Sequence, residues 1–117
     1  MARRSLVAGG LALSLLAGTL LTGCAHQDAG ALASQACARV ARGLAIEQRA
    51  TLASGPTAVR LRGEALAEVR SALPLAAVAA GEDTTWQALG ATLSETNRVP
   101  LTDLVHALRA QCAGTAG

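Results

Sequence analysis

Four stretches of the chain place apolar residues at helical spacing, and no stretch alternates in the manner of a strand. The first stretch covers residues 31–53. Its apolar residues recur every four positions: Leu32, Ala36, Val40 and Leu44. This spacing predicts an amphipathic helix. The Ser-Gly-Pro sequence at 54–56 is expected to end it, because glycine suits the position past a helix end and proline can begin the next helix.

A second helix is predicted over residues 56–73. Its expected apolar face holds four residues: Val59, Leu66, Val69 and Leu73. Arg60 and Glu64 lie on the other side, and a pair four residues apart contributes a few tenths of a kcal/mol. Pro74 ends or kinks this helix, because proline lacks an N–H and clashes with the preceding turn. A short apolar segment, residues 75–80, follows.

A third helix is predicted after the turn at 81–85, where Asp or Thr can accept from the first free N–H groups. It presents Trp86, Leu89 and Leu93 on one face. After a loop at 97–100, the fourth helix has the most regular stripe of the chain: Leu101, Leu104, Val105, Leu108 and Cys112. The expected fold is therefore all-α, a small bundle of three to four antiparallel helices over residues 31–114.

The N-terminus has a different pattern. Arg3 and Arg4 are followed by an apolar run at 6–21, and small residues occupy 22–25. This order of basic, apolar and small segments predicts a secretory signal.

The sequence Leu21-Thr22-Gly23-Cys24 resembles the lipobox of bacterial lipoproteins. The resemblance implies a diacylglyceryl group on the sulfur of Cys24 and cleavage just before it. Residues 1–23 would then be the signal peptide and 24–30 a tether to the outer face of the cell membrane. Two alternatives remain open, plain secretion and an uncleaved anchor, although the apolar run is shorter than the roughly 20 residues of a spanning helix.

Cys37 and Cys112 remain as an even pair, which in an exported protein favours a disulfide. In an up-down bundle the start of the first helix lies beside the end of the last. The helix order thus agrees with the chemistry, and we expect a disulfide-stapled bundle.

Removal of the signal changes the charge of the chain. The full sequence has ten arginines and eight acidic residues, and two of the arginines leave with residues 1–23. The remaining chain is formally neutral and has one Trp but no Lys, Phe or Tyr. This composition argues against nucleic-acid binding, which relies on basic surfaces and aromatic stacking.

The sequence contains no recognisable catalytic or cofactor motif, and we expect neither an enzyme nor a bound cofactor or metal. His26 falls in the tether. Asp103 and His106 are one turn apart on the fourth helix, and Glu64 and Glu68 on the second. Both pairs are interpreted as solvated surface residues.

The polar sequence Glu95-Thr96-Asn97-Arg98 connects two apolar helices. Loops held between rigid elements often carry binding residues, so Glu95, Asn97 and Arg98 are the candidate contact surface. The surrounding segment, residues 86–112, resembles parts of small exported proteins of high-GC Gram-positive bacteria: "WQALGATLSETNRVPLTDLVHALRAQC". This resemblance implies no particular activity.

These observations favour a lipid-anchored, non-catalytic binding module. Its expected partner is another component of the cell envelope, namely a protein. The alternative is a carrier that holds a small ligand, haem or a lipid, between its helices.

Overall fold

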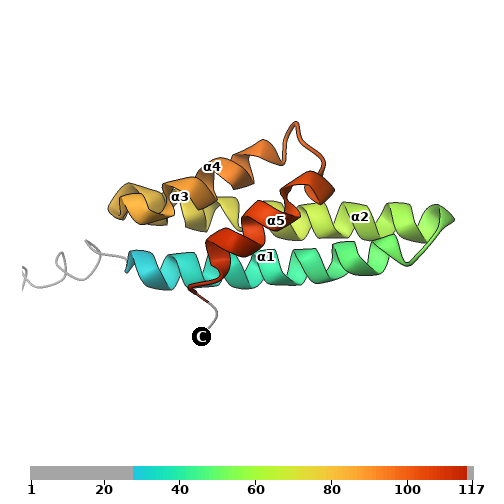
Figure 1. Ribbon diagram of the computed structural model, residues 1–117, viewed down its shortest axis with the longest axis horizontal. Helices are drawn as coiled ribbons and strands as arrows, with labels where there is room; N and C mark the ends of the chain where they lie inside the picture. Colours follow the sequence, from blue (N-terminus) through green and yellow to red (C-terminus); the bar gives the residue numbers. More distant parts are fainter. Residues whose placement is uncertain (1–27, 116–117) are drawn as a thin grey trace, which may run out of the picture.

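The computed structural model describes residues 28–115, and every regular element in that range is helical (Figure 1). The elements in chain order are α1 (Ala29–Thr51), α2 (Gly55–Arg70), α3 (Leu73–Glu82), the 3-10 turn η1 (Thr84–Trp86), α4 (Gln87–Glu95) and α5 (Leu101–Cys112). The all-α, disulfide-stapled bundle expected from the sequence is confirmed. The predicted signal peptide, residues 1–23, and most of the tether lie outside the described residues.

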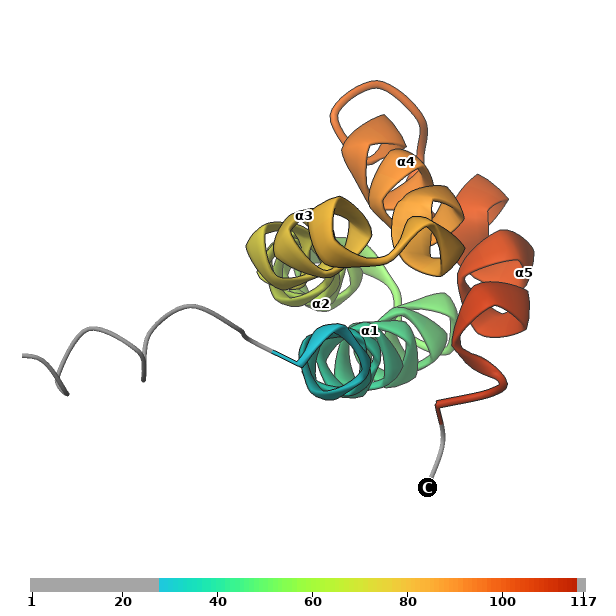
Figure 2. The same cartoon turned by 90° about the vertical axis from the view of Figure 1, so that its left-hand side faces the viewer.

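The helices form four antiparallel arms. α2 and α3 are separated by only two residues and together run back along α1, and α4 and α5 complete the bundle (Figure 1). Viewed from the end, the four arms surround one core, with α5 beside α1 (Figure 2). The first and last helices are therefore neighbours, as the up-down order predicts.

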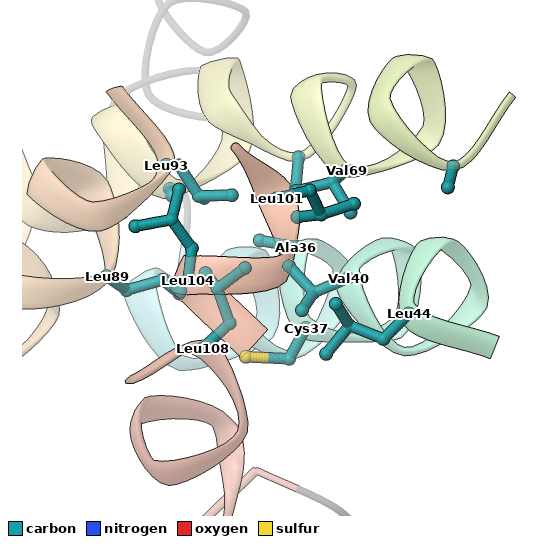
Figure 3. Packing of buried hydrophobic residues seen from close by; sticks show 13 residues of the cluster. Ala36, Cys37, Val40, Leu44, Val69, Leu89, Leu93, Leu101, Leu104 and Leu108 are labelled. Carbon is teal, nitrogen blue, oxygen red and sulfur yellow. The ribbon is translucent and has the colours of Figure 1, made fainter. Parts of the chain in front are cut away.

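The apolar stripe predicted for the first helix is confirmed. Leu32, Ala36, Val40 and Leu44 are all buried. Most of this stripe lies in the main core, where it meets Leu89 and Leu93 of α4 and three leucines of α5, Leu101, Leu104 and Leu108 (Figure 3). The helix begins at Ala29, two residues earlier than expected, because the Asp28 side chain accepts a hydrogen bond from the Gly30 N–H at 3.0 Å.

The turn between α1 and α2 lies close to the expected place, but α1 ends at Thr51, two residues early, and Gly55 begins α2 rather than following the end of α1. Gly55 has a positive φ of 59°, a conformation that glycine adopts without strain, and Pro56 lies in the first turn of α2.

Pro74 lies at a break between two separate helices and does not kink a continuous one. α2 ends at Arg70, three residues before the predicted end, and Ser71 and Ala72 form a turn. Pro74 then lies in the first turn of α3, where its missing N–H costs nothing.

The face predicted for the second helix is largely wrong. Val59 is 70% exposed, and Leu66 and Leu73 are only partly buried. The buried residues of this arm are smaller on average: Ala58, Leu61, Ala65, Val69 and Ala72. On this side of α2, Val69 and the backbone of Ala65 lie against Gly43 of α1, which has no side chain and so allows the two helices to approach closely.

The later elements match their predicted faces. Trp86 is half-buried at the end of η1. It packs against the main core and against a smaller cluster of Leu32, Ala33 and Ala79. On α5, Val105 and Cys112 lie partly buried at the edge of the core. Among the helices described, none has both the length and the apolar character needed to cross a membrane.

Candidate functional site

The disulfide joins the first and last helices. Cys37 of α1 and Cys112, the last residue of α5, are bonded with their Cα atoms 5.5 Å apart and 75 positions apart in sequence. The predicted pairing is confirmed. Cys24, the predicted lipid attachment site, lies outside the described residues, as does His26.

The predicted contact loop begins at Glu95, the last residue of α4, and two of its three candidate residues bind each other. The Arg98 guanidinium donates to both Glu95 carboxylate oxygens, at 2.6 and 3.0 Å. The hydrogen bond and the charge of Glu95 raise the pKa of Arg98 above its usual value. Asn97 is exposed, and its amide nitrogen lies 3.5 Å from the Ser94 carbonyl.

Contacts with the core and with α2 hold the loop in position. Thr96 is 4% exposed, and its hydroxyl donates to the Leu93 carbonyl at 2.7 Å. The Arg70 guanidinium of α2 donates to the Thr96 carbonyl at 2.8 Å. Val99 packs against the main core. The loop is thus attached both to the core and to the neighbouring arm.

The other ionisable candidates lie on the surface. Asp103 and His106 are exposed on α5. Glu64 pairs with Arg60 at 2.8 Å, as predicted, and Glu68 pairs with Arg42 of α1 at 2.9 Å. Within residues 28–115 no three His, Cys, Asp or Glu side chains gather in a way that could hold a metal ion.

A cavity of about 500 Å³ opens between the contact loop, α1 and α2. The apolar part of the lining consists of Leu66, Val99, Pro100 and Leu101. The polar lining consists of Glu47, Arg62, Thr96, Asn97, Arg98 and Thr102. The predicted loop therefore forms one side of a concave site, which its sequence alone does not show.

Glu47 is the residue that sequence reasoning missed. It is only 5% exposed and also lines a second cavity of about 320 Å³ beside Arg109. In the described part of the chain its carboxylate has neither an ion pair nor a hydrogen bond, yet its oxygens are not sealed from solvent. A signal was available, because the stripe of Val40 and Leu44 continues through position 47 at helical spacing.

A third concavity, of about 400 Å³, lies between α1 and α5 beside the disulfide. Its lining is mainly apolar and includes Val40, Leu44 and Leu108. The only charged residue in this lining is Arg109. This groove suits an apolar group, whereas the cavity at Glu47 suits a charged one.

Comparisons of the chain with protein-family models, with characterised proteins and with solved structures found no match.

Proposed function

We propose that this protein is a non-catalytic binding module of the cell envelope, exported and held at the outer face of the cell membrane by a lipid on Cys24. The observation that carries the proposal is the Cys37–Cys112 disulfide. Such bonds form and persist in oxidising compartments outside the cytosol. Export in turn agrees with the signal-like N-terminus and its lipobox-like exit.

The architecture supports binding rather than catalysis. The disulfide and the buried contacts of the loop hold a polar surface on a rigid helical frame, the arrangement typical of binding sites. The ionisable pairs considered in the sequence, Asp103 with His106 and Glu64 with Glu68, lie on open helix faces. The expected partner is another envelope protein.

The anchor is tested by the intact mass of the protein extracted from its own membranes, with and without reduction. We expect a chain that starts at Cys24, carries a diacylglyceryl increment and gains two hydrogens on reduction. An unmodified, cleaved chain would refute the lipid anchor. The partner is tested by pulldown from envelope extracts with immobilised protein, and recovery of none would contradict the interaction role.

The second candidate function is a carrier for a small apolar ligand. The groove of about 400 Å³ beside the disulfide favours it, since cavities of this size hold small molecules. A lipid chain fits this lining better than haem does, because His106 lies on the exposed side of α5. Native mass spectrometry of the extracted protein tests this function, and a ligand mass that survives desolvation is the expected result.

A further inference from the structure

We infer that the cavity at Glu47 binds a small zwitterion, a ligand with an ammonium group, a carboxylate and an apolar side chain. Free amino acids and short peptides with free termini share this chemistry. The inference goes beyond the proposed function, whose expected partner is an envelope protein, because it adds a site for a small molecule on the same domain.

The first step is the unpaired carboxylate of Glu47. Burying a charge without a partner is costly, and buried charges in proteins are normally paired. Glu47 lines the cavity, is 5% exposed and has neither an ion pair nor a hydrogen bond within residues 28–115. A ligand that donates charged N–H groups supplies the missing partner, and an ammonium group does this.

The second step is the guanidinium of Arg62 on α2. Of the two arginines in the lining, Arg98 is already neutralised by Glu95. Arg62 is exposed and has no ion pair in the described part of the chain. A free guanidinium at the edge of a cavity suits a carboxylate, because its N–H groups match both carboxylate oxygens. The same cavity therefore offers one group for each end of a zwitterion.

The third step is the apolar part of the cavity lining. Leu66, Val99 and Leu101 line the cavity between the loop and the helices. They offer contact to an aliphatic side chain, and the volume of about 500 Å³ is in the range of small-molecule sites. The ligand class is thus defined by two opposite charges and one aliphatic group.

The test is isothermal titration of the full chain, disulfide intact, in non-ionic detergent micelles at pH 7. The probes are L-leucine, L-leucyl-L-leucine, L-leucinamide, which lacks the carboxylate, and 4-methylpentanoate, which lacks the ammonium group. We expect saturable binding of at least one of the first two probes and about tenfold or greater loss for the last two. Tighter binding of leucine identifies free amino acids as the source, and tighter binding of the dipeptide identifies peptides.

Variants locate the site. Glu47→Gln and Arg62→Gln are each expected to weaken binding about tenfold, because each removes a charge-assisted hydrogen bond. The matched controls Glu64→Gln and Arg60→Gln alter an exposed pair on α2 and are expected to leave binding unchanged. If Glu47→Gln does not fold, as judged by circular dichroism, the exposed Arg62 provides the decisive variant.

Three results overturn the inference: no binding of leucine or its dipeptide up to about 10 mM, equal binding of leucinamide, or unchanged binding by the Arg62 variant. The titration needs neither export nor a lipid. Its failure alongside a lipidated chain and a captured protein partner would therefore overturn the zwitterion site and leave the proposed function standing.

Discussion

Gly43 of α1 lies directly against Val69 of α2, and the space between them has no room for a side chain. A Cβ placed at position 43 would contact a Val69 methyl group and lie only 3.0 Å from the Ala65 carbonyl oxygen and 3.1 Å from the Val69 nitrogen. Two of these atoms belong to the backbone, which cannot move without shifting the helix. This contact sets the distance between the two longest helices of the bundle.

Gly43→Ala is accordingly expected to lower the free energy of unfolding by up to about 2 kcal/mol. Overpacking of a tight interface costs about 1–3 kcal/mol, and it outweighs the helix propensity gained, which is about 1 kcal/mol. Urea denaturation followed by circular dichroism measures the difference. The matched control is Gly63→Ala on α2, an exposed helical position with nothing within 4 Å. This control is expected to stabilise the protein by about 0.5–1 kcal/mol, and a stabilising Gly43→Ala would show that the helices are not in close contact.

Reduction of the Cys37–Cys112 disulfide is expected to lower the free energy of unfolding by up to about 4.5 kcal/mol. The bond closes a loop of 75 positions, and loss of this closure restores conformational freedom to the unfolded chain. Denaturation with and without a reductant measures the effect. The double variant Cys37→Ala, Cys112→Ala is the control and should be insensitive to reductant. An equal denaturation midpoint for the oxidised and reduced wild-type protein would refute the stabilising role.

Glu47→Leu is expected to raise the free energy of unfolding of the ligand-free protein by about 1–2 kcal/mol. Replacing a buried charged group by an apolar one of similar size is often stabilising, because the charged group no longer has to be desolvated. Thermal denaturation compares the variant with Glu64→Leu, whose carboxylate is exposed, and which should change stability by less than about 0.5 kcal/mol. A destabilised Glu47→Leu would mean that the carboxylate has a stabilising partner after all.

The start of the third arm, at η1 and α4, is expected to depend on pH through Asp83. The Thr85 side chain and the Thr85 N–H, at 2.9 Å, both hydrogen-bond to its carboxylate and lower its pKa below the ordinary value of 3.8. Because the folded-state pKa is lowered, the stabilising contribution is present above the unfolded pKa. It is lost as the pH falls through the lowered one.

We therefore expect the Asp83 carboxyl carbon to titrate, by NMR, below the midpoint of an unstructured Asp peptide, and η1 to fray only in that acidic range. Thr85→Val removes the hydroxyl and should move the midpoint back toward the ordinary value. A midpoint unchanged by this variant would assign the shift to the backbone N–H alone.

Most of the fold was predictable because it depends on local chemistry. A proline such as Pro74 cannot be accommodated in a helix beyond its first turn, and Gly55 adopts the positive φ at the start of α2. The buried faces of α1 and α5 were also predictable, because each contains large aliphatic side chains at one clear spacing. The Cys37–Cys112 pair then followed from the order of the helices.

The face of α2 and the burial of Glu47 were not predictable in the same way. The spacing of large apolar residues predicted that Val59 is buried, but Val59 is exposed, because the side of α2 that meets α1 at Gly43 carries Ala65 and Val69. Likewise the contact loop was a candidate from its polarity, but its spacing from Glu47 and Arg62 depends on how three arms pack. Local sequence thus determined the helices and the breaks between them, and the even pair of cysteines predicted the disulfide. Only tertiary packing decided which faces met and which charges the cavity brought together, since both depend on contacts between residues far apart in the chain.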